Sequence, residues 1–390
     1  MPETPMPSDA PDVLVVNAGS SSLKVGRRPS GAAVTIERIG EPGRAHDHVD
    51  AWRRAEAALA DAPGAAPLER VAVVAHRVVH GGERYTEPIV VDDAVIDVLE
   101  GLVPLAPLHN PANLAALRAA RAALPDVPHV AVFDTAFHAT MAPHAYRYAV
   151  PEAWYLDHGV RRYGFHGPSH DGVTRRAAAL LERPRDELRI VSLHLGNGAS
   201  AAAVDRGRSV ETTMGFTPID GLIMGTRSGS LDPGVLLHLL RAGKSAAELD
   251  VELNRASGLL GLSGRSNDVR DLRHAADAGD DRATLALRAF AYRARLAIGS
   301  LAFAMGGLDA VVFTGGIGEH DARMRAEILT GLEAFGIAVD ADANAAHGPR
   351  IDPDGAVAVL VVATDEEGMM ADAALAAVAA LDATTAGRHP

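Results

Sequence analysis

The segment Asn17–Lys24 (NAGSSSLK) follows the apolar run Val13–Val16 and combines small residues, hydroxyl groups and one lysine. A buried strand that ends in such a turn brings backbone N–H groups and a cation close to an anion, as a nucleotide phosphate requires. The G-x-x-x-x-G-K-[ST] spacing of a P-loop is absent. Taken alone, the segment also fits an ordinary hairpin turn.

The same pattern occurs twice more along the chain. The apolar segments 189–195 and 309–313 run into the small-residue turns 196–200 and 314–319. After the first two of the three turns, residues 23–27 and 201–205 are predicted to return as strands of a hairpin. The sequence therefore predicts one supersecondary unit that is used twice, once in each half of the chain.

Two arginines lie beside turn glycines. Arg77 follows the buried strand predicted at 71–75 and precedes the turn His80–Gly82, and Arg227 lies in the glycine-rich segment 225–230. A guanidinium in such a loop can clamp a carboxylate or a phosphate through two hydrogen bonds. A solvated arginine or a structural ion pair is the alternative at each position.

Two histidines are also candidates for chemistry, with structural histidines as the alternative. His109 lies between prolines in the segment 107–111, and His166 is flanked by Gly164 and Gly167. His166 and His170 are four residues apart, but the glutamate of H-E-x-x-H is missing and a proline intervenes. We therefore do not expect a zinc site there.

The acidic candidates stand at the ends of predicted elements. Asp134 follows the strand predicted at 129–133, and Thr364–Glu367 (TDEE) fits a capping box in which Glu367 reaches back to Thr364. This interpretation leaves Glu366 as a candidate metal ligand. Asp268 and Arg270 are polar loop residues without an assigned task.

The elements that must position these residues alternate between strands and helices, which predicts an α/β protein with mostly enclosed sheets. The strands are expected at 13–16, 71–75, 129–133, 189–195, 310–313 and 357–362. The helices are expected at 49–61, 93–102, 113–124, 169–181, 233–240, 280–305 and 366–381. The proline-rich residues 1–11 are predicted to be disordered.

The bulk composition excludes several classes of function. The chain has 390 residues, enough for two domains, with 48% apolar and 22% charged residues. A net charge of −13 argues against binding to nucleic acid or to an anionic membrane. There are no cysteines, so disulfides and thiolate chemistry are excluded. Without a visible signal peptide or an apolar run long enough to span a bilayer, we expect a cytoplasmic protein.

Together, these motifs resemble the acetate kinase family of the sugar kinase/Hsp70/actin superfamily. The resemblance covers almost the whole chain except the start, residues 28–70 and the tail, and its motifs are specific only as a set. It is carried by the segments 17–24, 76–83, 106–113, 133–138, 161–171, 194–200, 209–233, 258–272, 313–319 and 364–367.

The resemblance implies a two-domain actin-like ATPase fold, in which a duplicated core of mixed β-sheet is flanked by helices and the active site lies in an interdomain cleft. It implies an N-terminal domain over 12–148 that is completed by the C-terminal helix 366–381, and a nucleotide-binding domain over 149–365. Residues 382–390 are expected to form a flexible tail.

The resemblance also implies roles for individual residues. The catalytic set corresponds to Arg77, His109, Asp134, His166 and Arg227, and a small apolar pocket for the acetate methyl to Val79, Leu108, Phe165 and Pro218. Asn17 and Glu366 match the residues that position Mg²⁺. The nucleotide is expected to contact Ser20, Ser22, Lys24, His194, Leu195, Gly196, Asn197, Gly198, Asp268, Val269, Arg270, Gly316, Ile317, Gly318, Glu319 and His320.

Five positions depart from the pattern of the family. His320 and Asp365 stand where asparagine is common, Val269 stands where an aromatic residue is common, Pro168 replaces a threonine and Ser228 a frequent cysteine. The changes at His320 and Val269 bear on the choice of nucleotide base. None of the five affects the expected transition-state residues.

The implied reaction is the reversible, Mg²⁺-dependent transfer of a phosphoryl group from ATP to acetate, which gives acetyl phosphate and ADP by direct in-line transfer. Mn²⁺ is the alternative metal, and the resemblance implies a homodimer. A carboxylate is already ionised at pH 7, because carboxyl pKa values lie near ~4, so the reaction needs no general base. Asp134 is therefore expected to orient an arginine or a metal-bound water.

Two alternatives remain open. A kinase for a longer carboxylate, such as propionate or butyrate, would use the same machinery with a larger pocket. An actin-like or Hsp70-like binding module would keep the phosphate turns, but it would have no use for the apolar pocket or the paired arginines.

Overall fold

The computed structural model describes residues 11–61 and 67–386, so the predicted disorder of the chain start falls almost wholly outside the described residues. The chain forms two compact units. The first unit comprises the chain up to Ala136 together with the segment from Asp365 onward, and the second unit comprises Phe137–Thr364.

The first unit contains a six-stranded mixed sheet in the order β3-β2-β1-β4-β6-β5. β1 pairs antiparallel with β2 and parallel with β4, and β6 continues the parallel part. The strands are β1 (Val13–Ala18), β2 (Ser22–Arg28), β3 (Ala33–Glu37), β4 (Val73–Val78), β5 (Ile89–Val90) and β6 (His129–Phe133). The helices are α1 (His48–Ala60), η1 (Leu68–Arg70), α2 (Asp93–Gly101), η2 (Val103–Leu105), α3 (Asn110–Ala123) and α15 (Glu366–Ala386).

The second unit contains a five-stranded mixed sheet in the order β11-β10-β7-β8-β9. Its strands are β7 (Arg189–Leu195), β8 (Ala199–Asp205), β9 (Arg208–Thr212), β10 (Ala310–Thr314) and β11 (Ala358–Val361). Its longer helices are α6 (Gly167–Leu180), α7 (Pro233–Arg241), α8 (Ala246–Arg255), α10 (Val269–Asp277), α11 (Asp281–Met305) and α13 (Ala322–Leu329). Its shorter ones are η3 (Ala136–Thr140), α4 (Pro143–Tyr146), α5 (Glu152–His158), η4 (Arg185–Glu187), α9 (Gly258–Ser263), α12 (Gly315–His320), η5 (Glu333–Phe335) and α14 (Ala341–Ala345).

The two sheets repeat one topology. In each, the first three strands form an antiparallel meander, and two further strands extend the sheet in parallel from the first strand. The chain orders β3-β2-β1-β4-β6 and β9-β8-β7-β10-β11 therefore match strand for strand. The predicted duplication of one supersecondary unit is confirmed.

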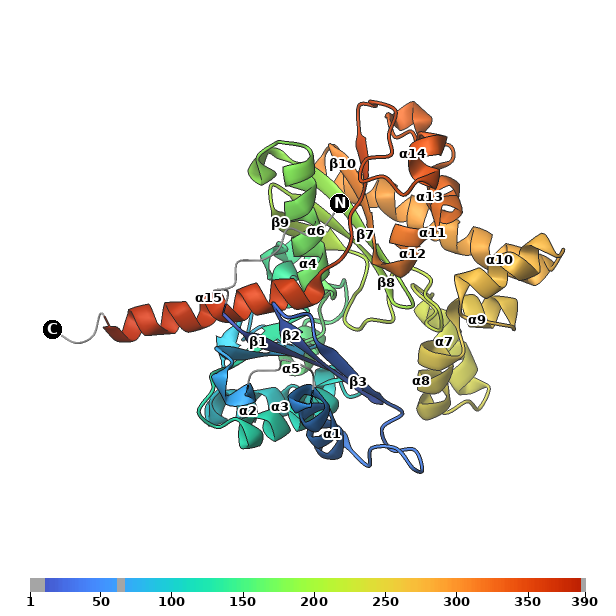
Figure 1. The fold of residues 1–390 in the computed structure, drawn as a ribbon. Coiled ribbons are helices and arrows are strands. Elements are labelled where there is room, and N and C mark those ends of the chain that lie inside the picture. Colours follow the sequence, from blue (N-terminus) through green and yellow to red (C-terminus); the bar gives the residue numbers. More distant parts are fainter. Residues whose placement is uncertain (1–10, 62–66, 387–390) are drawn as a thin grey trace. The chain divides into compact units, whose positions relative to one another are not determined.

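Strand alternation explains how the helices cover both faces of the first sheet, because successive side chains point to opposite sides. Val13 and Val15 pack against the terminal helix α15, whereas Leu14 and Val16 pack in the cluster that contains α1 and α3. Figure 1 shows α15 in red against the sheet, on the opposite side from α1, α2 and α3 in blue and cyan. A strand buried on both faces is a continuous apolar run, as the sequence showed.

The second sheet is enclosed in the same way. α6 packs its Val173 and Ala177 on one face against Ile190 and Val312, and α11 contacts β7, β8 and β9. Figure 1 shows α6 and α11 beside this sheet. Asp280 caps α11 by accepting hydrogen bonds from the N–H groups of residues 282 and 283, at the start that the sequence predicted.

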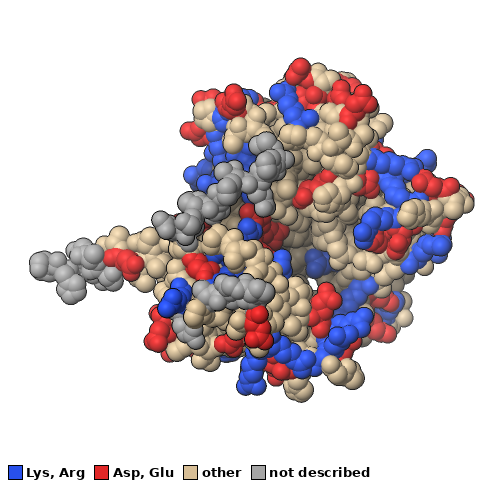
Figure 2. Space-filling model, viewed as in Figure 1, with Lys and Arg blue, Asp and Glu red and all other residues tan. Residues whose placement is uncertain are grey.

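Two details differ from the sequence-based expectations. The turn expected at 314–319 is the short helix α12, and α15 extends to Ala386 rather than ending near Leu381. No described helix combines the length and the apolar character that crossing a bilayer requires. Acidic and basic side chains are interspersed on the face shown in Figure 2, so no large surface of one sign is seen there.

Candidate active site

The turn after β1 is a tight hairpin that sets Asn17 opposite Lys24 in the β1–β2 register. The Gly19 N–H donates to the carbonyl of Ser22 at 2.8 Å, and a Cβ on Gly19 would lie only 2.8 Å from Ser22 Oγ. Lys24 Nζ pairs with Glu367 Oε1 at 2.5 Å, while Ser20 is exposed. The expected phosphate turn therefore has its lysine paired with the first turn of α15.

Arg77 and Asp134 form a bidentate ion pair at the carboxyl ends of β4 and β6. Arg77 Nε donates to Asp134 Oδ1 at 2.8 Å and Nη2 donates to Oδ2 at 2.6 Å. Arg77 Nη1 also donates to Asn17 Oδ1 at 3.3 Å. Parallel neighbouring strands end at the same edge of the sheet, which brings these residues together although they are far apart in sequence. Asp134 thus pairs with an arginine, which is the contact that the first of its two expected roles requires.

The electrostatics of this pair favour the charged arginine. Burial alone would lower the pKa of Arg77, but the charge and hydrogen bonds of Asp134, together with the charge of Glu366, raise it above its ordinary value. The side chain of Asp134 is 4% exposed and that of Arg77 is 21% exposed. Arg77 is therefore a fixed cation held at the rim of the sheet.

The start of α15 corrects the predicted capping box. Asp365 Oδ1 accepts from the N–H of Gly368 at 3.0 Å, so Asp365 caps the helix instead of Thr364. Glu367 pairs with Lys24 rather than reaching back to the cap. Thr364 belongs to the second unit, where its N–H donates to Glu319 Oε1 at 3.0 Å. Glu366 remains a candidate metal ligand, and its charge contributes to raising the pKa of Arg77.

The oxygen atoms near Arg77 fit a magnesium ion held jointly with a nucleotide. Among the described residues, no three His, Cys, Asp or Glu side chains gather closely enough to hold a metal by themselves. Mg²⁺ usually keeps several waters and binds one or two protein oxygens in addition to substrate phosphates. An amide oxygen from Asn17 and a carboxylate from Glu366 would meet that need.

Three further candidates of the first unit lie at or near the start of α3. Asn113 Oδ1 accepts from the Val79 N–H at 3.0 Å, and its Nδ2 donates to the carbonyl of Ala18 at 2.7 Å, which ties the ends of β1 and β4 to α3. His109 occupies the N-cap position of α3 without a side-chain cap bond. Leu108 beside it is 36% exposed, whereas Val79 is 8% exposed.

The turn after β7 gathers three candidates of the second unit. His194 lies opposite Ser200 in the β7–β8 register, and the Gly196 N–H donates to the carbonyl of Gly198 at 3.0 Å. A Cβ on Gly198 would lie 3.5 Å from Nε2 of His166 and 3.8 Å from Nη1 of Arg227. The turn, the imidazole and the guanidinium therefore converge around one small residue.

The loop that carries Arg227 is fastened to this turn. The Gly225 N–H donates to the carbonyl of Asn197 at 2.9 Å, and a Cβ on Gly225 would overlap the Asn197 side chain. Asn197 Oδ1 accepts from Asn267 Nδ2 at 2.9 Å, and Arg227 Nη1 reaches the carbonyl of Pro218 at 3.5 Å. Leu195, at the end of β7, is fully buried and anchors the turn.

His166 adopts a left-handed backbone conformation, with φ of +58°, at the N-cap of α6. Its ring stacks on that of His194, with centroids 4.4 Å apart, and its Nδ1 lies 2.9 Å from Ser200 Oγ. The preceding Phe165 is 2% exposed, and its carbonyl accepts from His138 Nε2 at 2.9 Å. A non-glycine residue at positive φ is uncommon outside tight sites.

The expected adenosine-side residues lie in two separate places of the second unit. Asp268 caps α10 and pairs with the exposed Arg270 at 2.6 Å, which holds the pKa of Asp268 below its ordinary value. Val269 is buried in the first turn of that helix.

The other set forms α12. The carboxylate of Glu319 accepts from the N–H of Gly315 at 3.0 Å and fixes the start of the helix. Gly316 is open, with nothing near an added Cβ, Gly318 is buried, and His320 is 79% exposed. Ile317 is partly exposed between them.

Comparison with known proteins identifies the family. The sequence model of the acetokinase family matches residues 31–372. The chain belongs to the acetokinase family. It is therefore a phosphotransferase with a carboxyl group as acceptor.

Named relatives extend over nearly the whole chain. It is 50% identical over 382 residues to an acetate kinase of Pseudarthrobacter chlorophenolicus, covering 93% of this chain and 98% of that protein. It is 50% identical to an acetate kinase of Deinococcus radiodurans, with coverage of 92% and 96%.

Solved structures agree with this assignment. An acetate kinase of Porphyromonas gingivalis matches with a TM-score of 0.89 and 41% identity, covering 95% of this chain and all of that one. A propionate kinase of Francisella tularensis matches with a TM-score of 0.89 and 34% identity, with coverage of 94% and 100%. These acetokinase-type structures confirm the predicted fold class.

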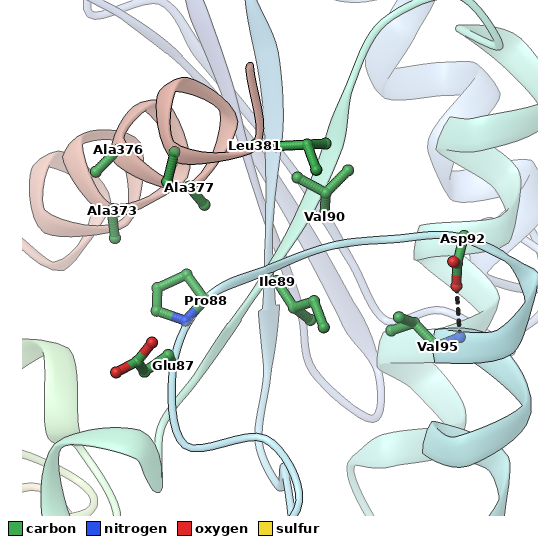
Figure 3. Close-up of a pocket in the computed structure, with 11 residues that line it drawn as sticks. Glu87, Pro88, Ile89, Val90, Asp92, Val95, Ala373, Ala376, Ala377 and Leu381 are labelled. Carbon is green, nitrogen blue, oxygen red and sulfur yellow. Dashed lines mark hydrogen bonds between the residues drawn. The ribbon is translucent and has the colours of Figure 1, made fainter. Parts of the chain in front are cut away.

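A groove of about 780 Å³ in the first unit is separate from all these candidates. Figure 3 shows Pro88 and Val90 on the side of Ala373 and Ala377 of α15, whereas Ile89 points toward Val95. The residues that line it are mainly apolar and include acidic but no basic side chains. The groove is therefore unsuited to a nucleotide phosphate.

Sequence reasoning missed several residues that contact the candidates. Ser200 lies within hydrogen-bond distance of His166 and His170, and Ser192 lies within hydrogen-bond distance of His170. Asn267 donates a hydrogen bond to Asn197. The spacing of His166 and His170 was noted as a rejected zinc motif, yet both rings lie within hydrogen-bond distance of Ser200 Oγ. The sequence offered one signal for these contacts, since the polar residues Ser192 and His194 alternate with apolar residues in the strand at 189–195.

Proposed function

We propose that this member of the acetokinase family is an acetate kinase, which catalyses ATP + acetate ⇌ acetyl phosphate + ADP. An acetate oxygen attacks the γ-phosphorus, and the bond between that phosphorus and the oxygen bridging to ADP breaks. The bidentate Arg77–Asp134 pair is the observation that carries the proposal. The pair holds Arg77 as a fixed cation at the end of β4 and occupies the carboxylate of Asp134. A carboxylate paired in this way suits a reaction whose acceptor needs no general base.

The acceptor accounts for the role of Asp134. Acetate is ionised at neutral pH, because its carboxyl pKa lies near ~4, so nothing has to remove a proton before attack. Asp134 engages the Nε–Nη2 edge of Arg77, so a second carboxylate must bind along another edge of the guanidinium. In this proposal Arg77 orients acetate by that edge, and His109 supports the same side.

Arg227 and His166 are proposed to bind the equatorial oxygens of the transferring phosphoryl group. Both approach Gly198, where a backbone turn leaves room for a ligand. Phosphoryl transfer depends mostly on positioning and on stabilising charge over these oxygens. A guanidinium and an imidazole N–H are suitable donors for that purpose.

The nucleotide is proposed to lie along the two phosphate turns. Ser20, Ser22 and Lys24 supply one turn, and residues 194–198 supply the other, while residues 268–270 and 316–320 contact the adenosine. Asn17 and Glu366 would hold Mg²⁺, or Mn²⁺ with the same oxygen ligands, whose charge offsets that of the β- and γ-phosphates when it is bound.

Acetate is favoured over longer acids by the proposed pocket of Val79, Leu108, Phe165 and Pro218. A propionate or short-chain carboxylate kinase is the alternative, since the matching structure from Francisella tularensis is described as a propionate kinase. We further propose a cytoplasmic homodimer with acetate and ATP as its partners, and without nucleic acid or membrane. The domains expected from the resemblance, 12–148 with 366–381 and 149–365, differ in their bounds from the compact units, which divide after Ala136 and after Thr364.

Hydroxamate formation tests the function directly. Purified protein with ATP, Mg²⁺, acetate and hydroxylamine should accumulate acetyl hydroxamate, because hydroxylamine traps acetyl phosphate. Reactions without acetate, or with propionate in its place, serve as controls and rank the acceptors. A protein that binds ATP but forms no hydroxamate with either acid would be an ATP-driven binding module instead.

A further inference from the structure

Six serine and histidine side chains of the second unit form a connected group where α6 packs on β7 and β8. We call this group the serine–histidine cluster, and it consists of His166, Ser169, His170, Ser192, His194 and Ser200. Ser192 and His194 are two residues apart on β7, and His194 lies opposite Ser200 on β8. The cluster thus lies on one face of the sheet, beneath the start of α6.

Ser200 joins two histidines of this cluster. Its Oγ lies 2.9 Å from Nδ1 of His166 and 2.8 Å from Nε2 of His170. Nδ1 of His170 lies 3.0 Å from Ser192 Oγ. Ser192, Ser200 and His170 are fully buried. A chain of hydrogen bonds therefore runs from the core of the sheet to His166.

The proton count restricts what this chain can do. A serine hydroxyl carries one proton and two acceptor lone pairs, so Ser200 donates to at most one of the two histidines and accepts from any histidine that it does not donate to. Burial, followed by the charges of His138 and His194, holds the pKa of His170 well below its ordinary value, so its ring is neutral and has one N–H at pH 7.

One arrangement of the hydroxyl and imidazole protons leaves an N–H donor of His166 at the candidate site. Ser192 donates to Nδ1 of His170, whose Nε2–H donates to Ser200, and Ser200 donates to Nδ1 of His166. The proton of a neutral His166 must then sit on Nε2, the nitrogen that lies near Gly198. If Nδ1–H of His166 instead donated to Ser200, a neutral His166 would present a lone pair on Nε2. That lone pair would repel a phosphoryl oxygen.

We propose that Ser200, oriented by His170 and Ser192, is a positioning residue that keeps the proton of His166 on Nε2 for the transferring phosphoryl group. This rests on the proposed function, in which His166 binds that group. The consequence is that His166 donates a hydrogen bond from its neutral form as well as from its charged form. Turnover then does not depend on protonation of His166.

The titratable and charged groups that face the chain come from four elements. His194 of β7 stacks on His166, and His170 of α6 shares Ser200 with it. His138 of η3 meets the edge of His170 with centroids 5.8 Å apart, and Arg227 approaches the same glycine as His166.

The pH dependence of turnover in Ser200→Ala tests the proposal. At acidic pH, where a doubly protonated His166 would donate from both ring nitrogens, the variant should turn over within about threefold of wild type. Near pH 8 its turnover should fall about tenfold, as when an imidazole loses its orienting partner. This loss should appear as a new alkaline limb in the pH profile of the variant. Ser200→Thr, which keeps the hydroxyl, should restore the wild-type profile.

Ser209→Ala is the matched control. Ser209 is also fully buried, and its Oγ lies 2.7 Å from Nδ1 of His138, so the variant loses a comparable hydroxyl–imidazole bond that involves neither His166 nor Ser200. Its pH profile should keep the wild-type shape. An unchanged profile in Ser200→Ala, or the same limb in both variants, would overturn the proposal.

A spectroscopic measurement on the wild-type protein keeps the test independent of variant folding. Long-range ¹H–¹⁵N correlations distinguish the two neutral tautomers, and the His166 signals are those that vanish in His166→Gln. A neutral Nε2–H form at pH 8 supports the proposal, and a neutral Nδ1–H form overturns it. Undiminished turnover of His166→Gln would contradict the proposed function itself, whereas normal loss there with a flat Ser200→Ala profile contradicts only the positioning role.

Discussion

The hairpins β1–β2 and β7–β8 occupy equivalent places in two sheets of the same strand order, yet they carry different chemistry. In the first, Asn17 faces Lys24, and the surrounding contacts are ion pairs. In the second, His194 faces Ser200, and the contacts are hydrogen bonds between hydroxyls and imidazoles. The repeated backbone topology therefore places polar side chains at equivalent positions of the two sheets. The residue types at those positions differ, so the two hairpins carry different charges.

The two arginines show the same contrast. Arg77 is fixed by two short hydrogen bonds to Asp134, whereas Arg227 approaches Gly198 of the second turn together with His166. A guanidinium already paired with a carboxylate is rigid and partly neutralised. We therefore expect Arg77 to contribute chiefly orientation and Arg227 chiefly charge.

Arg227→Ala should have the largest effect. Arginines that act on transferring phosphoryl groups contribute roughly 10³–10⁵ in turnover, so we expect kcat to fall by at least about 10² while ATP affinity changes much less. Steady-state kinetics with nucleotide titration measures both. Arg241→Ala, which removes an exposed arginine from α7 in the same unit, is the control. Near-wild-type turnover of Arg227→Ala would contradict the expectation that Arg227 stabilises the charge of the transferring phosphoryl group.

Asp134→Asn should have the next largest effect, because an amide cannot pair with the charge of Arg77. We expect kcat/KM for acetate to fall about tenfold, mainly through KM, in line with the loss of an orienting partner. Removing one partner of a buried pair also costs about 3–5 kcal/mol of stability, which thermal unfolding would record.

Glu327→Gln is the matched control for Asp134→Asn. It weakens a bidentate pair of the second unit, in which Arg273 donates to Glu327 at 2.6 and 2.8 Å. Its acetate kinetics should stay at the wild-type level. If Asp134→Asn left the KM for acetate unchanged, Arg77 would not orient the acceptor.

The sequence predicted the elements that are set by local pattern and missed those set by distant contacts. The strand at His129–Phe133 and the long helix at Asp281–Met305 follow from continuous apolar runs and from a capping aspartate. The glycines at 315–318 predicted a turn, but they form α12, whose last carbonyls accept from the buried Arg325. No local pattern reveals that contact.

The same limit applies to the candidate site. Residue type and turn glycines identified Arg77, Arg227 and His166 one by one. The partner of Arg77 is 57 residues away and that of His166 is 34 residues away, so the sheet register brings them together. Thr364 looked like a helix cap because its neighbours fit a motif, but Glu319 takes its N–H and Asp365 caps the helix.

Buried histidines extend the comparison to stability. In the first unit, His76 Nε2 and His129 Nδ1 lie 2.9 Å apart in the core, and Nδ1 of His76 has no hydrogen-bond partner among the described residues. Burial, followed by the charges of His129 and Arg121, lowers the pKa of His76 well below its ordinary value. The folded protein therefore keeps His76 neutral at pH values at which the unfolded chain takes up a proton.

The sign of the pH effect follows from this difference. The stabilisation is complete above the unfolded pKa of ~6.5 and is lost below it, by about 1.4 kcal/mol per pH unit for each such histidine. Unfolding free energies measured between pH 7 and pH 5 should thus fall less steeply in His76→Gln than in wild type. Turnover at pH 7 should be retained, unlike in variants of the serine–histidine cluster. Equal slopes would show that His76 does not govern acid stability.

Val79→Ala should have the smallest effect and tests the apolar side of the first unit. Val79 is 8% exposed and its N–H is held by Asn113, so the truncation removes two methyl groups without moving the backbone. One methylene in an apolar pocket is worth about 1–3 kcal/mol. The propionate/acetate ratio of kcat/KM should therefore rise by roughly fivefold, which corresponds to the lower end of that range.

The control for this change is Val235→Ala on the exposed face of α7, which should leave the ratio unaltered. A gain for propionate at Val79 alone means that the end of β4 sets acid size as well as acid orientation, since Arg77 lies two residues earlier. A ratio that does not move in Val79→Ala would place the methyl group of acetate elsewhere. The first hairpin and its neighbours would then contribute charge without selecting the acceptor.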